Sequence, residues 1–341
     1  MTPRKKSIAP YALALHDTPF PDYLRPTAAE CREVHQLLTE VHGEIKPPVK
    51  IPEPSLVVAG CGLVPSVLDA VIRTLLSSAT NGRNSSAAVQ GLARRFGILE
   101  EGIGRGSIDW DAVRVAPVED IFEAIKAGGL ANNKSKNIKR LLEMVYEENQ
   151  ERRAALLSST NPPAGADRES KDAKETEVAK AKEHVLSLDY LHLLPDQKLL
   201  EHLVRYPGVA HKTAKCVAMF CMGRKVFAVD THIFRITKWL GWFPERENNN
   251  AKAQAHMEER IPDELKYPLH GLFIKHGQRC PRCIAGNHPG SKGWNKGCAL
   301  DHLVKRTGKN AGNSIDETDV IAVGKKRVPR KVKGKGEATK I

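Results

Sequence analysis

Apolar residues recur at helical spacing along most of this chain, whereas alternating β-branched runs, which favour strands, are scarce. Thr27 and Glu30 have the spacing of a capping box, so we expect a helix from there to about residue 42. The same periodicity predicts helices over residues 64–76, 85–96, 118–125, 135–146, 195–204, 233–240, 251–260 and 265–276. The predicted fold class is therefore all-α.

Breaks in this pattern suggest a division into parts. Residues 1–24 are proline-rich and are expected to form a disordered tail, and residues 158–182 lack an apolar stripe and read as a solvated insertion. We expect one helical lobe over residues 64–230 and a second over 25–63 plus 231–304, with a cleft for DNA between them. Residues 305–341 are expected to be a basic disordered tail.

The net charge indicates what kind of partner the protein binds. The chain has 53 Lys and Arg residues and 40 acidic ones, which gives a net charge of +13. Such a balance favours a polyanionic partner, since each cation placed on a phosphate releases condensed counterions. Part of the charge lies in residues 325–335, which could be a nuclear address, a DNA-binding arm or a solvated tail. We expect a nuclear protein, with the mitochondrion as the alternative. No apolar run approaches the roughly 18 residues of a membrane helix.

The stretch Pro207-Gly-Val-Ala-His-Lys-Thr-Ala214 carries candidate chemistry. Gly208 suits a tight turn, and the helix expected after it would present free amides and a positive dipole end to an anion. Lys212 lies in the first turn of that helix, where a cation is unfavourable, so its unprotonated and nucleophilic form is favoured. A hairpin with an ordinary solvated lysine is the alternative interpretation.

Eighteen residues further on, Asp230 stands in Val229-Asp-Thr-His-Ile-Phe-Arg235, directly before another expected helix. Aspartate is a common helix N-cap, so a purely structural role is the alternative to catalysis. The two roles are compatible, because a cap also fixes where the carboxylate points.

These two motifs resemble those of the helix-hairpin-helix base-excision DNA glycosylases of the endonuclease III type. The resemblance is specific over residues 186–243 and weaker over about 64–285. Three stretches look closest to the Demeter-like branch of that family, namely the hairpin, Ser187-Leu-Asp-Tyr-Leu191 and Trp239-Leu-Gly-Trp-Phe-Pro244. The resemblance implies that Lys212 is a Schiff-base lysine and Asp230 a catalytic aspartate.

The resemblance also implies which residues contact DNA. Leu75-Leu-Ser-Ser78 matches a helix that ends beside the duplex, and residues 129–138 match a loop that faces it. The implied DNA-binding residues are Pro207, Gly208, Val209, Ala210, His211, Thr213, Ser78, Asn81, Asn132, Lys134 and Lys136. Leu130 and Ala131 are candidates for the base pocket.

Some positions depart from the family pattern. Ala210 replaces the second hairpin glycine, and Ala79 stands where a glutamine often fills the gap left by the extruded base. Asn81, Arg83 or Asn84 could take over that task. These departures affect substrate preference more than the expected lyase chemistry.

Cys280, Cys283 and Cys298 fall where the resemblance implies a four-cysteine loop holding a 4Fe–4S cluster. Only three cysteines are present, whereas four thiolates are the usual requirement. With His276 or His288 as a fourth ligand, structural zinc is an alternative, and a loop without metal is another.

We therefore expect a monomeric enzyme that acts on double-stranded DNA with a damaged base or an abasic site. It would combine DNA glycosylase and abasic-site lyase activity, with oxidised pyrimidines as the implied substrates. Excision of 5-methylcytosine is an alternative substrate specificity. An alternative of another class is a non-catalytic helix-hairpin-helix DNA-binding protein.

Overall fold

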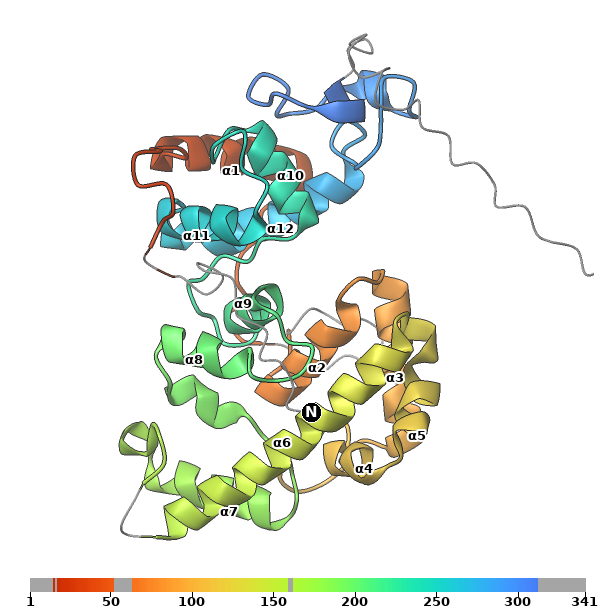
Figure 1. Ribbon diagram of the computed structural model, residues 1–341, viewed down its shortest axis with the longest axis vertical. Coiled ribbons are helices and arrows are strands. Elements are labelled where there is room, and N and C mark those ends of the chain that lie inside the picture. The colour runs from red at the N-terminus through yellow and green to blue at the C-terminus, as the bar shows by residue number, and fades with distance from the viewer. Residues whose placement is uncertain (1–14, 16, 52–62, 159–161, 312–341) are drawn as a thin grey trace, which may run out of the picture.

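The computed structural model describes residues 15, 17–51, 63–158 and 162–311 (Figure 1). Its regular elements within these ranges are helices, accompanied by an isolated β-bridge between Ile98 and Ile108. The predicted all-α fold class is therefore confirmed. The helices form two groups, one in the lower and one in the upper part of Figure 1, with α9 between them.

The lower group is built around one hydrophobic cluster, to which α9 also contributes Ala214 and Val217. The longest helix, α6, runs diagonally across the group in Figure 1, and α5 and α7 pack on it. The helices of this group are α2 (Val67–Ser77), α3 (Gly82–Phe96), α4 (Trp110–Val115), α5 (Val118–Ile125), α6 (Ala131–Leu157), α7 (Lys171–Lys182), α8 (Asp196–Leu203) and α9 (His211–Phe220).

The upper group surrounds a second, more aromatic cluster that includes Trp242, Phe243 and Phe273. Its helices are α1 (Ala28–His42), α10 (Thr231–Trp239), α11 (Asn250–Arg260) and α12 (Asp263–Arg279). The first helix is capped as its sequence predicts: Thr27 Oγ1 accepts from Glu30 N, and the Glu30 carboxylate accepts from Thr27 N.

The two clusters meet at the segment that links α9 to α10. Val226 and Ala228 belong to the lower cluster, whereas Phe227 and Val229 belong to the upper one. The four residues alternate between the two clusters, so this short segment contributes to both cores at once. It ends at Asp230, whose position is therefore set by both groups of helices.

The N-terminal boundary differs from the prediction. Residues 17–24 are not a disordered tail, because Thr18 Oγ1 lies 2.6 Å from His256 Nδ1 and Tyr23 donates to the Gly241 carbonyl at 2.7 Å. Residues 1–14 and 16 lie outside the described residues.

The predicted solvated insertion, residues 158–182, contains α7, which packs on α6. Arg152 Nη2 of α6 lies 3.0 Å from Glu177 Oε2, and Gln150 donates to the carbonyl of the buried Ala181 at 2.8 Å. The second half of the segment is therefore part of the lower group. Residues 159–161 lie outside the described residues.

The C-terminal boundary also differs, because residues 305–311 are attached to the upper group. Lys305 N donates to the Trp239 carbonyl at 2.8 Å, and Asn310 Nδ2 donates to the carbonyls of Arg282 and Ile284. Residues 312–341, including the basic run 325–335, lie outside the described residues. No described helix combines the length and apolar character that a membrane-spanning segment requires.

Candidate active site and metal-binding loop

The hairpin turn is built on a glycine that the packing requires. Gly208 has φ +81°, and a Cβ atom there would come within 2.7 Å of Asn137 Nδ2 and 3.0 Å of Leu75 Cδ1. The turn is closed by Val209 N, which donates to the Tyr206 carbonyl at 3.1 Å. The hairpin therefore lies directly against α2 and α6, and a side chain at position 208 would have to push the Asn137 and Leu75 side chains aside as well as adopt a left-handed backbone.

Helix α9 begins immediately after this turn with an open N-terminus. Its N-cap, Ala210, is extended (φ −91°, ψ 170°) and provides no side-chain hydrogen bond to the first amides. Because the backbone here is extended, alanine fits where the family has glycine. Lys212 is the second residue of the helix and is half-buried. Because no side chain of the N-cap residue occupies this end, the positive end of the helix dipole makes it a suitable place for an anion.

Asp230 is the N-cap of α10. Its Oδ1 accepts a hydrogen bond from Ile233 N at 2.8 Å, which fixes the carboxylate at the start of the helix. The side chain is half-buried, and Oδ2 accepts no hydrogen bond from any residue that the structure describes. One oxygen is therefore committed to the helix and the other can act on a ligand.

The imidazole of His270, on α12, lies near both candidate catalytic groups, Lys212 and Asp230. His270 is 2% exposed, and neither ring nitrogen has a hydrogen-bond partner among the described residues. Burial lowers the pKa of His270 to about 4, while the nearby Asp230 carboxylate raises it and the nearby Lys212 amine lowers it further. Both groups thus lie close enough to act electrostatically on one buried ring, although they belong to different helices.

Helix α11 holds the segment between Lys212 and Asp230. Glu258 Oε2 accepts from Phe227 N at 2.7 Å, and Gln254 Oε1 accepts from Val229 N at 3.1 Å. The same Glu258 oxygen lies 2.7 Å from Lys215 Nζ of α9. Sequence reasoning missed both α11 residues. The available signal was that polar residues, Gln254 and Glu258 among them, alternate with apolar ones in this part of the sequence.

The two basic residues closest to Lys212 in the sequence, His211 and Lys215, do not surround it with positive charge. Lys215 is fully buried and its charge is paired with Glu258, and burial lowers its pKa more than the carboxylate raises it. Burial, followed by the charge of Lys215, lowers the pKa of His211 as well. At neutral pH the His211 ring is therefore uncharged.

Most of the expected DNA-contacting residues are accessible. Gly208, Ala210, Ser78, Asn81, Asn132 and Lys136 are exposed, and Pro207 and His211 are half-buried. Val209 and Thr213 are 5% exposed, so their side chains belong to the core. Ser78 ends α2 by donating to the Leu75 carbonyl, and Asn81 caps α3, so both sit at helix ends.

The prediction for Lys134 is wrong. Its side chain is 4% exposed, and its amine donates to the Leu76 carbonyl at 2.7 Å and to the Gly128 carbonyl at 3.3 Å. These carbonyls lie at the end of α2 and just before α6. Lys134 therefore connects these two segments by hydrogen bonds and is not a phosphate ligand. Of the two base-pocket candidates, Ala131 is buried, whereas Leu130 is 58% exposed.

Two non-glycine residues beside these loops have left-handed backbones. Ala79 has φ +50° and Leu130 has φ +52°, and both are exposed. Such conformations cost roughly 1–3 kcal/mol and occur preferentially at functional sites. The strain marks the loops that follow α2 and precede α6 as candidate contact points.

The cysteine loop follows α12 and brings four potential metal ligands together. One donor atom from each of His276, Cys280, Cys283 and Cys298 lies within 4.8 Å of every other. His276 is therefore the fourth member that the structure provides, whereas His288 is exposed and outside the group. The basic side chains of this loop are divided: Arg282 pairs with Asp301 at 2.7 Å, while Arg279, Lys292 and Lys296 are exposed.

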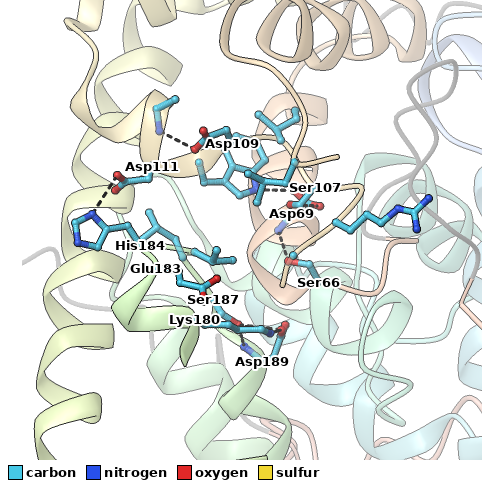
Figure 2. Close-up of a pocket in the computed structure, with 18 of the residues that line it drawn as sticks. Ser66, Asp69, Ser107, Asp109, Asp111, Lys180, Glu183, His184, Ser187 and Asp189 are labelled. Atoms are coloured by element: carbon cyan, nitrogen blue, oxygen red, sulfur yellow. Dashed lines mark hydrogen bonds and ion pairs between the residues drawn. The ribbon is translucent and has the colours of Figure 1, made fainter. Parts of the chain in front are cut away.

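A cavity of about 520 Å³ lies away from these groups, between the start of α2, the loop before α4 and the segment after α7 (Figure 2). Its polar groups satisfy one another. Asp69 accepts from Ser107 at 2.9 Å and from Trp110 at 2.6 Å, and Asp189 pairs with Lys180 at 2.8 Å. Neither Lys212 nor Asp230 lines it, so this cavity is not the candidate active site.

Comparisons with known proteins agree with the fold and the motifs. Residues 72–263 match the HhH-GPD superfamily of base excision DNA repair proteins. The chain is similar to "Putative DNA glycosylase At3g47830" of Arabidopsis thaliana, with 32% identity over 78% of this chain and 80% of that protein. Endonuclease III of Sulfolobus acidocaldarius is 24% identical over 66% of this chain and 82% of its own length.

The DNA glycosylase/AP lyase ROS1 of Arabidopsis thaliana is 24% identical over 46% of this chain, a region that is 9% of ROS1. Among solved structures, a non-covalent endonuclease III–DNA complex aligns with a TM-score of 0.51 over 82% of this chain and 95% of that chain, at 17% identity. The chain therefore belongs to the HhH-GPD superfamily of base excision DNA repair proteins.

Proposed function

We propose that this protein is a bifunctional DNA glycosylase and abasic-site lyase that acts on double-stranded DNA. The observation that carries the proposal is that Lys212 and Asp230, from two different helices, both lie close enough to the buried ring of His270 to act on it electrostatically. An amine and a carboxylate near one another are the groups that covalent excision of a base needs. The relatives named above, among them ROS1 with its glycosylase and lyase name, support the same activity.

DNA binding would begin at the hairpin. The open N-terminus of α9 offers backbone amides to a phosphate, and Gly208 allows the backbone to approach closely. Exposed Asn132 and Lys136 lie at the start of α6, where they can contact the duplex. The target nucleotide must leave the stack to reach Lys212, at a cost of a few kcal/mol.

The chemistry then proceeds through the amine. The unprotonated Lys212 nitrogen attacks the anomeric carbon, and the base departs with the electrons of the glycosidic bond and takes up a proton. Asp230 stabilises the positive charge that develops on the sugar and assists proton transfer. The bound sugar opens to an iminium ion. Loss of a proton from the adjacent carbon then expels the 3′ phosphate by β-elimination.

Oxidised pyrimidines are the substrate class that we propose, on the basis of the likeness to endonuclease III. The resemblance of the hairpin and of the stretches 187–191 and 239–244 to the Demeter-like branch supports 5-methylcytosine as the alternative. A product screen over duplexes that each carry one defined base separates the two. Release of thymine glycol but not 5-methylcytosine would support the first class, and the converse result would support the second.

Borohydride trapping on abasic-site DNA tests the catalytic assignment. The unmodified chain should form a covalent adduct, because reduction fixes the iminium ion. Lys212→Gln should form none while still shifting the DNA in a gel. Lys225→Gln, which removes an exposed lysine from the loop after α9, is the matched control and should trap normally.

Asp230→Asn keeps the hydrogen-bonding shape of the cap and removes the charge. It should bind DNA but lose most of the base-excision rate. If the unmodified chain binds DNA and gives no adduct, the protein is a non-catalytic helix-hairpin-helix binding protein, and the enzymatic proposal fails.

A further inference from the structure

We propose that the loop after α12 holds a single tetrahedral zinc ion, bound by Cys280, Cys283, Cys298 and His276, and does not hold an iron–sulfur cluster. The proposal concerns the upper group of helices and is independent of the proposed catalytic function. It rests on the spacing of the four donor atoms and on the groups that surround them.

The spacing fits one ion. A zinc–sulfur bond is about 2.3 Å long and a zinc–nitrogen bond about 2.0 Å, so a tetrahedral ion separates two sulfurs by about 3.8 Å and a sulfur from a nitrogen by about 3.5 Å. Cys283 Sγ and Cys298 Sγ are 3.7 Å apart, and His276 Nε2 is 3.2 Å from Cys298 Sγ. All four donors lie within 4.8 Å of one another, as ligands of one centre must.

An iron–sulfur cluster does not fit the same atoms. Each cysteine of such a cluster binds a different iron, and the core of irons and sulfides separates the protein sulfurs, so they cannot be in contact. The usual ligand set is also four thiolates, and the structure offers three with an imidazole. Of the other cysteines, Cys31, Cys216 and Cys221 are buried in the two cores, and Cys61 lies outside the described residues.

Hydrogen bonds from neighbouring residues orient donor atoms of the site and favour the binding of a cation. His276 Nδ1 lies 2.9 Å from His42 Nε2, a contact that uses the nitrogen facing away from the sulfurs and leaves Nε2 for the metal. Two donors also point at sulfur: Leu300 N at 3.3 Å from Cys298 Sγ, and Arg306 Nη2 at 3.5 Å from Cys283 Sγ. Such contacts stabilise the negative charge of thiolate ligands.

The site would be structural. Four protein ligands close the coordination sphere and leave no position for water or substrate, which is the pattern of structural zinc. The loop is joined to α10, because Arg235 Nη2 donates to the Cys283 carbonyl at 2.7 Å. Asp230 caps the N-terminus of that helix. The ion would therefore fix the loop that braces the helix carrying the candidate catalytic carboxylate.

Metal analysis of the full-length chain tests the proposal. Protein produced with both iron and zinc available, and purified without chelators, should contain about one zinc per chain and be colourless. Replacement by Co²⁺ should give the intense visible bands of a tetrahedral thiolate site. Stoichiometric iron and sulfide with broad visible absorption would overturn the proposal, and so would protein that retains neither metal.

Variants identify the ligands. His276→Ala should lose zinc, while His288→Ala and Cys61→Ser should keep it. His42→Ala removes only the supporting contact and should weaken zinc affinity about 10- to 100-fold in a chelator competition. This variant keeps all four ligands, so it remains informative if His276→Ala fails to fold. Full zinc affinity in both histidine variants, His276→Ala and His42→Ala, would overturn the ligand assignment.

Discussion

The Lys215 amine of α9 lies 2.7 Å from the Glu258 carboxylate of α11, and the exposed fractions of the two side chains are 0% and 1%. The second Glu258 oxygen lies 2.8 Å from the Lys266 amine. One carboxylate thus joins the hairpin helix to two helices of the upper group. Because Lys212 lies on α9, this joint fixes the candidate nucleophile relative to Asp230.

Removing that carboxylate should be strongly destabilising. Glu258→Ala would remove the carboxylate that pairs with the buried Lys215 and one of the two carboxylates that pair with Lys266, and breaking a buried pair in this way costs about 3–5 kcal/mol. Urea unfolding measures the loss. Glu259→Ala, at the exposed neighbouring position, should cost about 1 kcal/mol or less. If the two variants are equally stable, Glu258 does not join the two groups of helices.

His270 should make stability depend on pH in the acidic range. Its pKa is about 4 in the folded chain and near 6.5 when unfolded, so between these values only the unfolded chain binds the proton. The contribution is complete above about pH 6.5 and is lost as the pH falls toward 4, by up to about 3 kcal/mol.

His270→Phe has no such proton to bind. Between about pH 7 and about pH 4.5, this variant should therefore lose less stability than the unmodified chain. The difference between the two losses should be a large part of the roughly 3 kcal/mol given above. Urea midpoints at the two pH values measure the difference. Equal losses for both proteins would show that His270 is not a buried neutral imidazole.

The hairpin glycine should tolerate no side chain. Gly208→Ala meets both a left-handed backbone and the Asn137 and Leu75 side chains, so we expect a loss of about 2–3 kcal/mol and much weaker DNA binding. Gly223→Ala shares the positive φ (+65°) but meets no atom within 4 Å. It should cost about 1 kcal/mol, and the difference between the variants measures the contact with α2 and α6.

The left-handed backbone of Leu130 should lower the stability of the fold, while its exposed side chain should contribute to DNA contact. Leu130→Gly relieves the left-handed strain and should raise stability by about 1 kcal/mol, while removing an exposed apolar side chain beside the proposed DNA surface. We expect slower excision. Leu130→Asn, which tolerates the same backbone, separates the effect of strain from that of apolar contact. Excision at the unmodified rate in both variants would show that Leu130 does not contact the substrate.

Elements with strong local signals were predictable from sequence. The amphipathic pattern gave the bounds of α5, and the capping box located the start of α1. The second half of α6 was missed because its buried residues include Asn149 and Arg152, whose polar groups are satisfied by Ser187 and Glu177. A hydrophobic pattern cannot register burial of that kind.

Only those residues of the candidate site that stand in a local sequence motif could be predicted from the sequence. Lys212, Asp230 and the cysteines stand in recognisable local sequences, but Glu258 and His270 act through contacts made by the tertiary fold. His270 lies next to the buried Leu269 and near Leu272, where a single polar residue looks like an ordinary core position. Its importance becomes visible only when α12 is placed beside α9 and α10.

Lys134 links the turn after α2 to the turn before α6 by donating to one carbonyl at each. The strained residues Ala79 and Leu130 project from these same two turns. Because Lys134 holds both turns, a shift of one turn should be coupled to a shift of the other. The spacing between these two proposed DNA contacts is thus set within the protein itself, by the buried amine of Lys134.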